Sequence, residues 1–383
     1  MADGDTRPLD GQTAPTDRPA RTDAVVIGLN AVAIVVTGDT PKVLVVRRPY
    51  APLMSGDAGR HHFVDADDAG DTSVGLPFGP FDPDLHRTLE IGLRSWVEEQ
   101  THLRVEYVEQ LYTFGDRGRF FGAQGMPRVI SVGYLALTRE VAQHAHSEGT
   151  WESWYRYFPW EDWRAGEPGV IAKVIRPRLE AWALATRGSA LQARRLTRIE
   201  LCFGLGSIEW DEEKVLERYE LLYEAGLVAE AHRDRQDRQP QGLDKSHPSV
   251  TTPGHVPPTL SPSQTHPTGL GDPMQFDHRR VLATAIGRLR GKLKYRPVVF
   301  ELMPETFTLL ELQRMVEAIA GIRVHKQNFR RMVERSGLVE GTGQFLQTGG
   351  RPAEAFRFRR AVLKERAAIG ISVSRTRGDK PSE

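Results

Sequence analysis

Residues 76–103, LPFGPFDPDLHRTLEIGLRSWVEEQTHL, constrain the fold more than any other stretch of the chain. A Gly/Pro turn leads into a segment whose apolar side chains repeat at positions i, i+4, i+7 and i+8, namely Leu89, Leu93, Trp96 and Val97. This spacing predicts a helix that packs through one face. Ser95, Glu98 and Glu99 share another sector of that helix, because residues three and four apart are neighbours on its surface. The stretch therefore predicts a packed helix with adjacent carboxylates on a second face.

These adjacent carboxylates have two interpretations. Glu98 and Glu99 could hold a hard cation such as Mg²⁺ against a phosphate, since that ion prefers oxygen ligands. Alternatively, they are a solvent-facing pair on a surface helix, because glutamate is mostly exposed in proteins.

The same stretch resembles the Nudix box, whose signature is G-x5-E-x7-R-E-U-x-E-E-x-G-U, where U is aliphatic. Arg94, Glu98, Glu99 and Leu103 match the signature, and Trp96 stands in for the aliphatic residue before the acidic pair. The resemblance implies a Nudix fold. In active members of the family, glutamates at the positions of Ser95, Glu98 and Glu99 carry the metal ion.

Several positions depart from the box. Ser95 replaces the glutamate after the arginine, so one of the three metal-carrying acids is absent. The other departures are His86 for the first glutamate, Pro80 for the first glycine (Gly79 is one residue away) and Thr101-His102 for the second glycine step.

The departures imply weak or lost hydrolase activity. We therefore interpret Arg94, Ser95, Glu98 and Glu99 as a degenerate box and assign no catalytic residue. No cofactor is expected to be required, although Mg²⁺ on Glu98 and Glu99 stays open.

Length and composition bound the class of protein. The chain has 383 residues, enough for two or three domains. Its single cysteine, Cys202, excludes an intramolecular disulfide and a cysteine-based zinc site and fits a reducing compartment. No secretory signal opens the sequence, and no run reaches the roughly 18 apolar residues of a membrane helix. We expect a cytoplasmic protein with no membrane partner.

The charge is distributed unevenly. Residues 276–383 hold 22 Lys and Arg against 11 Asp and Glu, a net charge of +11. The remaining residues hold 29 against 39, a net charge of −10. A basic C-terminal third on an acidic body indicates a polyanionic partner for that third, although many basic surfaces bind nothing.

Four runs in the N-terminal part have the composition of strands. Residues 24–36 and 43–48 flank a turn, and residues 105–119 and 127–140 follow the Nudix-like stretch. Between them lies a loop with His61-His62, which we discount as a metal site because adjacent side chains of a strand or helix point in different directions.

The phrases EQLYTFGD (109–116) and RVISVGYLAL (128–137) resemble one branch of the Nudix superfamily, the Nudix-related transcriptional regulators of NAD metabolism. In the wider family, loops around these strands line the nucleotide pocket, which here implies Tyr112, Phe114, Asp116 and Arg119. The predicted ligand-binding set is Arg47, Arg94, Glu98, Glu99, Phe114 and Arg119. Core packing is the alternative for the aromatic residues, and a charged strand end is the alternative for Arg47.

The middle of the chain contains three further segments. Residues 150–165 hold four tryptophans, and so much aromatic area is costly to expose. We expect this segment to pack on the body, with a subunit interface as the alternative. Residues 166–231 look helical, and the helix within residues 210–228 joins domains or forms a dimer. Residues 232–275 are rich in proline and poor in large apolar residues, which predicts a disordered linker.

The basic third predicts a helix followed by a helix-turn-helix. Residues 276–304 suggest an amphipathic helix, with a polar side and exit loop carrying Arg288, Arg290, Lys292, Lys294 and Arg296. Thr308 and Glu311 can form a capping box at the start of the next helix, and Gly321 ends it. A second helix then begins near His325.

The second helix of this pair has an apolar and a polar face. Phe329, Met332 and Val333 are expected to face the core. Residues 344–360 follow as a two-stranded wing. The predicted DNA-binding set is Lys326, Gln327, Asn328, Arg330, Arg331, Arg335 and the wing-loop residue Arg351, which are side-chain types that contact base edges and phosphates.

The sequence thus predicts an α+β protein. An N-terminal Nudix-like α/β/α sandwich with a mixed sheet precedes a C-terminal winged helix-turn-helix. The expected boundaries are a disordered tail at 1–22, a Nudix-like ligand-sensing domain at 23–165, a helical connecting segment at 166–231, a disordered linker at 232–275, a winged helix-turn-helix domain at 276–366 and a disordered tail at 367–383.

The resemblance implies a homodimeric DNA-binding transcriptional regulator, a repressor of NAD biosynthesis or salvage genes. Its partners would be a double-stranded DNA operator and a nucleotide effector such as ADP-ribose. One alternative is an active Nudix hydrolase that uses Mg²⁺ on a nucleoside diphosphate derivative. A second is an adaptor whose basic third binds protein.

Overall fold

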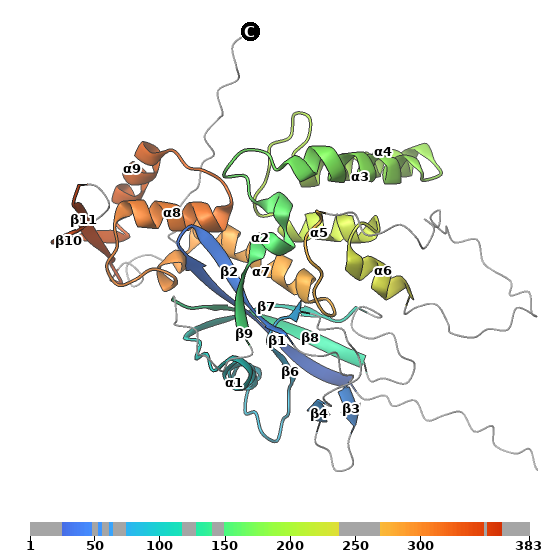
Figure 1. Cartoon of the computed structure of the whole chain (residues 1–383), viewed down its shortest axis with the longest axis horizontal. Coiled ribbons are helices and arrows are strands. Elements are labelled where there is room, and N and C mark those ends of the chain that lie inside the picture. The colour runs from blue at the N-terminus through green and yellow to red at the C-terminus, as the bar shows by residue number, and fades with distance from the viewer. Residues whose placement is uncertain are drawn as a thin grey trace, which may run out of the picture.

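The structure is a computed structural model that describes residues 25–47, 53–55, 61–63, 74–116, 128–139, 149–236, 269–347 and 351–361. A mixed sheet lies between helix α1 (Leu89–Thr101) on one side and a layer of helices on the other (Figure 1). The predicted terminal tails at 1–22 and 367–383 lie outside the described residues.

The sheet has seven strands. Its path runs β5-β2-β1-β8-β7, while β6 also pairs with β1 and β9 with β2. The strands are β1 (Val25–Thr37), β2 (Thr40–Arg47), β5 (Val74–Gly75), β6 (Phe78–Pro80), β7 (Tyr107–Phe114), β8 (Arg128–Leu137) and β9 (Gly149–Ser153). β1 pairs parallel with β8 and antiparallel with β2 and β6, so the sheet is mixed as predicted. β3 (Leu53–Ser55) and β4 (His61–Phe63) form a separate pair.

β1 divides the core into two layers. Successive side chains of a strand point to opposite faces of a sheet. Leu29, Ala31 and Ala33 therefore pack with α1, whose Leu93 and Val97 are fully buried. The alternate side chains Val32, Ile34 and Val36 belong to the larger core on the other face.

The aromatic segment covers that other face. It spans residues 150–165 and includes most of β9, α2 (Trp154–Tyr157) and the short helix η1 (Pro159–Glu161). Trp154, Tyr157, Phe158 and Trp160 are at most 1% exposed, so the predicted packing on the body is confirmed. Two helices that come much later in the sequence than most of the sheet, α5 (Val215–Glu224) and α7 (His278–Tyr295), complete this layer.

The C-terminal part is not a separately tethered body, because one core runs from the sheet through α7 into the winged helix. α5 begins at Val215 and is a core helix, with Val215, Tyr219 and Leu222 at most 1% exposed. The predicted disordered linker at 232–275 is wrong at both ends, and residues 237–268 lie outside the described residues. α6 (Ala229–Gln236) continues past residue 232, and Leu270 and Met274 are buried beside α7.

Helix α7 differs from its predicted role, because its basic residues do not form a free polar side. Five of its six Lys and Arg side chains make ion pairs with acids from residues 109–230. The pairs are Arg279–Glu230, Arg280–Glu220, Arg290–Glu161, Lys292–Glu109 and Lys294–Glu213. Acids of the body therefore neutralise five cations of the basic third, all of them on α7.

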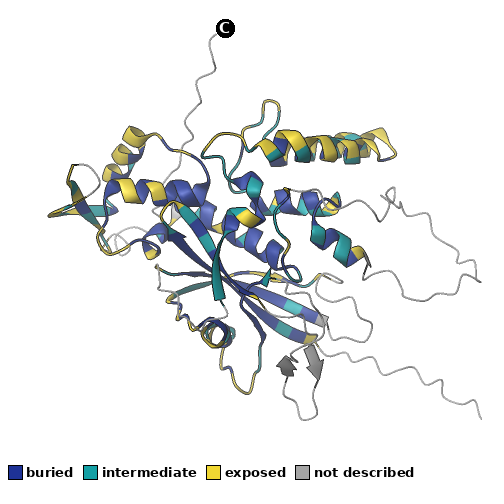
Figure 2. Cartoon of the chain, in the orientation of Figure 1, coloured by how far each residue is buried: buried dark blue, intermediate teal, exposed yellow. Residues whose placement is uncertain are grey.

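A helical hairpin projects from this layer and is largely exposed (Figure 2). It consists of α3 (Arg176–Leu184) and α4 (Ser189–Phe203), preceded by the π-helical turn η2 (Ile171–Ile175). Within the described residues, no helix is both long and apolar enough to cross a bilayer.

The C-terminal elements have the expected helix-turn-helix order. They are η3 (Val298–Glu301), α8 (Leu309–Ala320), α9 (Lys326–Ser336), β10 (Val339–Leu346) and β11 (Ala353–Phe358). The capping box of Thr308 and Glu311 is confirmed, and Gly321 caps α8 in the left-handed conformation. The wing begins at Val339, earlier than the predicted residue 344. The α+β class, with an N-terminal sandwich and a C-terminal winged helix, is confirmed.

Candidate functional site

The degenerate box lies on α1 and the turn before it. The Thr88 side chain accepts a hydrogen bond from Ile91 N at 3.2 Å and so caps the helix. His102 ends it with a φ of 55°, in the left-handed conformation that glycine usually supplies at this position. The helix is therefore intact despite the missing glycine step.

Gly79 and His86 have packing roles in the turn. A Cβ on Gly79 would overlap the indole of Trp96, whose Nε1 donates to Pro80 O at 2.8 Å. His86 is 8% exposed, and its Nδ1 accepts from Asp82 N at 3.2 Å. The residue at the first glutamate position of the signature is therefore part of the packing beneath α1.

Arg94 connects α1 to the loop that follows it. Its guanidinium donates to Glu90 Oε1, with the shorter bond at 2.8 Å, and to the backbone oxygens of Val105 and Glu106. Ser95 Oγ donates back to Ile91 O at 3.1 Å. Arg94 and Ser95 therefore both donate hydrogen bonds to backbone oxygens of α1 or of the loop that follows it.

The acidic pair does not form a complete metal site. Glu98 accepts from Arg104 Nε at 2.7 Å, and Glu99 is exposed. Across the described part of the chain, no three His, Cys, Asp or Glu side chains gather as metal ligands would. Mg²⁺ needs several oxygen ligands in near-octahedral geometry, and these residues supply two carboxylates of which one is already paired. Within the described residues, Glu98 and Glu99 alone therefore do not supply the ligands that Mg²⁺ needs.

The other predicted ligand residues do not gather around this pair. Phe114 is 3% exposed and packs in the core layer opposite α1, where its ring lies 5.2 Å from that of Tyr112. It is a core residue, contrary to the prediction that it contacts a nucleotide. Arg47 ends β2 and lies 3.6 Å from Glu152 of β9. Arg119 lies outside the described residues.

Helix α9 presents the second candidate site. Phe329 and Val333 are buried as predicted, and Met332 is partly buried against the same core. All six predicted contact residues are exposed: Lys326, Gln327, Asn328, Arg330, Arg331 and Arg335. A helix that packs through one side therefore turns four cations and two amides outward.

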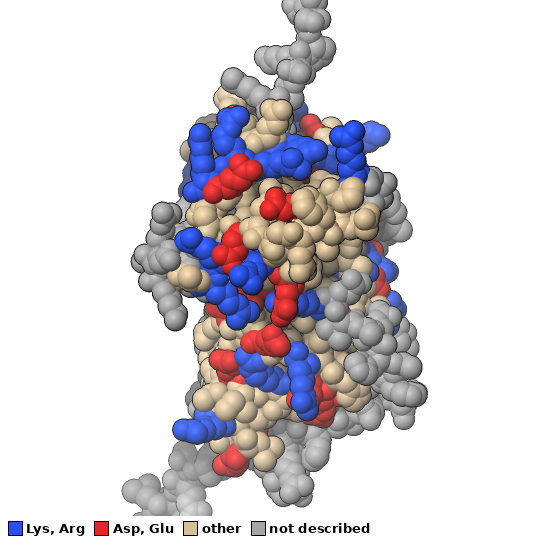
Figure 3. All heavy atoms as spheres, turned by 90° about the vertical axis from the view of Figure 1, so that its left-hand side faces the viewer, with Lys and Arg blue, Asp and Glu red and all other residues tan. Residues whose placement is uncertain are grey.

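Among the described residues, these cations differ from the five paired cations of α7 in having no acidic partner. Within the part of the chain that the structure describes, Lys326, Arg330, Arg331 and Arg335 make no ion pair. Figure 3 faces the end of the molecule that carries α9 and the wing, and Lys and Arg side chains gather across its top. Unpaired, exposed cations on one helix are the arrangement that attracts a polyanion.

The turn before α9 is held by two buried residues of α8 that the sequence analysis did not single out. Glu317 Oε1 accepts from Val324 N at 3.1 Å, and its other oxygen pairs with Arg323 at 2.6 Å. Gln313 Nε2 donates to Val324 O at 3.2 Å. The sequence did contain a signal for this role, because Gln313 and Glu317 are polar residues four apart on the apolar side of α8. Buried polar groups need hydrogen-bond partners, so such a pair indicates a structural contact.

The wing packs back on the helical core. Phe358 stacks on Phe300 with ring centroids 4.3 Å apart, and Arg357 pairs with Glu340 at 2.7 Å across the two strands. Arg351 is exposed at the tip of the wing. The wing therefore stands beside α9 on the same core.

Comparison with known proteins places a family match in the C-terminal part of the chain. Residues 299–358, from η3 to the end of β11, match the model of the NrtR DNA-binding winged helix domain. The ADPR responsive transcriptional repressor NtrR of Acinetobacter baylyi is 44% identical over 85 residues. That alignment covers 22% of this chain, and the chain spans about a third (34%) of the length of this relative.

Solved structures resemble the chain over most of its length, but loosely. The NrtR of Shewanella oneidensis bound to a 27mer DNA is 20% identical with a TM-score of 0.45, covering 87% of this chain and 93% of that one. A MutT/nudix family protein from Enterococcus faecalis is 15% identical with a TM-score of 0.44, covering 91% and 90%.

Proposed function

We propose that this chain, whose residues 299–358 match the NrtR winged helix domain, is a DNA-binding transcriptional regulator and acts as a repressor. α9 is its recognition helix and the wing a second contact. The N-terminal sandwich is a Nudix-like domain that senses ADP-ribose or a related nucleotide, and the regulated genes serve NAD biosynthesis or salvage. The protein works in the cytoplasm, where its DNA and nucleotide partners meet.

The observation that carries this proposal is the outer face of α9. Its exposed residues include cations of the type that binds phosphates, which have no acidic partner among the residues that the structure describes, and amides that can pair with base edges. Five of the six cations of α7, by contrast, are paired with acids of the body. The ADPR-responsive repressor from Acinetobacter baylyi supports the choice of effector.

Regulation follows from linkage between the two ligands. A nucleotide that prefers one arrangement of the protein changes DNA affinity by its differential affinity for the two arrangements, and DNA changes nucleotide affinity by the same factor. We propose a homodimer, because two recognition helices read a pseudo-palindromic operator with half-sites about one helical turn, or a multiple of it, apart.

Titration of the promoter upstream of this chain's own coding sequence tests the assignment of α9. We expect Arg330→Ala and Arg331→Ala each to weaken binding about tenfold or more, since one good contact to a base is worth roughly 1–3 kcal/mol. ADP-ribose affinity, measured by calorimetry without DNA, should stay unchanged.

Arg178→Ala and Arg187→Ala are matched controls, because both arginines are exposed on or beside the α3–α4 hairpin and lack an ion pair within the described residues. Equal effects at both places would mean that the protein binds DNA through general charge. No binding of any NAD-gene promoter fragment would favour the adaptor alternative. Turnover of ADP-ribose with Mg²⁺ would restore the hydrolase alternative.

A further inference from the structure

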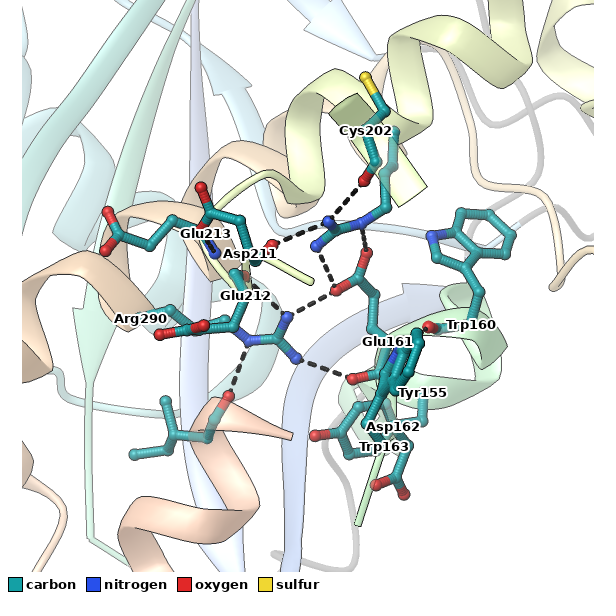
Figure 4. Close-up of polar contacts among 12 residues, drawn as sticks. Tyr155, Trp160, Glu161, Asp162, Trp163, Cys202, Asp211, Glu212, Glu213 and Arg290 are labelled. Carbon is teal, nitrogen blue, oxygen red and sulfur yellow. Dashed lines mark hydrogen bonds and ion pairs between the residues drawn. The ribbon is translucent and has the colours of Figure 1, made fainter. Parts of the chain in front are cut away.

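Glu161 is the central member of a buried network of ion pairs. Its carboxylate accepts from Arg218 at 2.6 and 2.9 Å and from Arg290 at 2.5 Å, and all three side chains are 0% exposed. Glu161 belongs to η1, Arg218 to α5 and Arg290 to α7. Figure 4 shows the Arg290 side chain directed at Glu161. This network of ion pairs therefore joins η1, α5 and α7, which are far apart in sequence.

Both guanidinium groups use their other donors on backbone oxygens. Arg218 Nη1 donates to Cys202 O at 3.0 Å and to Asp211 O at 2.8 Å. Arg290 donates to Glu212 O at 3.0 Å and to Ile319 O at 2.9 Å. A buried charge network is stable when every member has its partners, and the loss of one member leaves the others unpaired.

The contact with Ile319 is one of three that hold the C-terminal end of α8. The last carbonyls of a helix have no partner within the helix. Here Ile319 O accepts from Arg290, Ala318 O accepts from the Tyr155 hydroxyl at 2.8 Å, and the cap residue Gly321 accepts from Trp163 N at 2.7 Å. All three donors come from the aromatic segment or α7.

At Gly321, the end of α8 packs closely against the aromatic segment and α7. A Cβ at this position would lie 2.8 Å from Arg290 Nη2 and 3.0 Å from the Tyr155 hydroxyl, and closer still to Glu161 O. Gly321 also has a φ of 71°, which side chains other than glycine rarely adopt. The end of α8 therefore has little freedom to shift against the aromatic segment.

From Gly321 the chain passes directly into the turn that Glu317 and Gln313 hold, and then into α9. On the other side, Glu161 follows β9 and α2, and β9 is hydrogen-bonded to β2 of the sheet. A continuous set of short contacts thus runs from the sheet edge through Glu161 and Tyr155 to α9.

We propose that Glu161 and Tyr155 are positioning residues for DNA binding: they fix α9 relative to the N-terminal sandwich by holding the C-terminal end of α8. The role rests on the proposed function of α9. Neither residue touches DNA. They set the orientation in which α9 is presented, and a change at the β2–β9 edge of the sheet reaches α9 through them.

Tyr155→Phe and Glu161→Gln test the role in the full chain. Tyr155→Phe keeps the ring and removes the bond to Ala318 O, while Glu161→Gln keeps the shape and removes the charge. We expect Tyr155→Phe to weaken binding of the upstream promoter about fivefold and Glu161→Gln tenfold or more. ADP-ribose affinity without DNA should stay within twofold. The factor by which ADP-ribose changes DNA affinity should move towards one in both variants.

Tyr223→Phe is the matched control, because it removes a hydroxyl bond of 2.6 Å to Asp234 that joins α5 to α6 and does not reach α8. It should bind DNA as the unchanged protein does. All titrations are made well below the melting temperature of each variant. A residue that only supports the fold lowers that temperature without changing the dissociation constant of the folded protein.

Dissociation constants within twofold of the unchanged protein for both Tyr155→Phe and Glu161→Gln, with the ADP-ribose response intact, would overturn the positioning role. If Glu161→Gln does not fold, Tyr155→Phe decides alone. Arg330→Ala is measured in parallel. If it too leaves DNA affinity unchanged, the recognition-helix assignment fails and the positioning role fails with it. Loss of binding in Arg330→Ala alone overturns only the positioning role.

Discussion

Gly321→Ala should destabilise the protein more than an ordinary glycine replacement. Gly321 has a φ of 71°, and placing alanine in the left-handed region costs about 1–2 kcal/mol. The new methyl group would also meet the backbone oxygen of Glu161, which cannot swing away as a side chain can. Overpacking of this kind costs roughly a further 1–3 kcal/mol. The expected loss in the free energy of unfolding is therefore about 2–5 kcal/mol.

Gly206→Ala separates the two contributions. Gly206 has a φ of 67°, close to that of Gly321, but a Cβ there would meet nothing within 4 Å. Its replacement should cost only the backbone term, about 1–2 kcal/mol. The two variants differ in the contact with the aromatic segment and hardly at all in backbone strain.

Urea unfolding followed by far-ultraviolet circular dichroism measures both losses from the midpoint and slope of each curve. The slope should stay constant, since neither variant changes the area exposed on unfolding. If Gly321→Ala and Gly206→Ala agree within about 0.5 kcal/mol, the end of α8 yields easily and the close packing argued for it is wrong.

Two further predictions concern the region before and beneath α1. Burial, followed by the charge of Arg233, lowers the pKa of His278 to about 3, and its Nδ1 accepts from Leu76 N at 3.0 Å. The unfolded chain therefore binds this proton more readily, so this contribution to stability is complete above about pH 6.5 and falls by about 1.4 kcal/mol per pH unit towards pH 3. Urea midpoints at pH 7 and pH 5 should differ less in His278→Asn than in the unchanged protein, and equal differences would refute the assignment. Gly79→Ala should displace the Trp96 indole and shift its fluorescence, whereas Gly38→Ala, with nothing within 4 Å, should not; an unchanged spectrum would contradict the packing.

The helix-turn-helix was predictable because its signals are local. The capping box of Thr308 and Glu311, the glycine stop at Gly321 and the apolar spacing of Phe329 and Val333 all lie within a few residues of what they determine. The strands at the centre of the sheet were likewise marked by their own composition. Their order was not, since β6 and β9 join it through pairings that no local pattern contains.

The partners of α7 were not predictable for the same reason. The apolar stripe of α7 predicts one packed face, and the cations outside that stripe are then expected to face solvent. In the protein, Lys292 meets Glu109 across 183 residues of sequence, and Arg290 meets Glu161 across 129. Burial raises the pKa of Glu109, but hydrogen bonds from Lys292 and Tyr107 outweigh it and leave the pKa below its ordinary value.

Phe114 shows the limit of carrying a loop role over from a resemblance. Its position next to a Gly-containing loop suggested a nucleotide contact. The ring instead lies in the core beneath α7, where Arg280 lies 5.1 Å from its centroid. A register shift between Gln110 and Tyr112 breaks the alternation of β7, so that Leu111 and Phe114, three residues apart, are both buried. One residue of register decides between the two faces of a strand.

The neutralised cations of α7 determine how DNA binding should respond to salt. Each phosphate contact releases counterions and contributes roughly 0.9 to the slope of log affinity against log salt. The net charge of +11 on residues 276–383 would suggest a slope near −10 for each protomer. Because five of the six α7 cations are already paired with acids of the body, the slope should instead follow the predicted contacts, which are the four exposed cations of α9 and Arg351 of the wing, and at roughly 0.9 for each contact it is about −4.5. A fragment lacking the body would expose the α7 cations to solvent, and it would bind DNA with a steeper salt dependence and less regard for sequence.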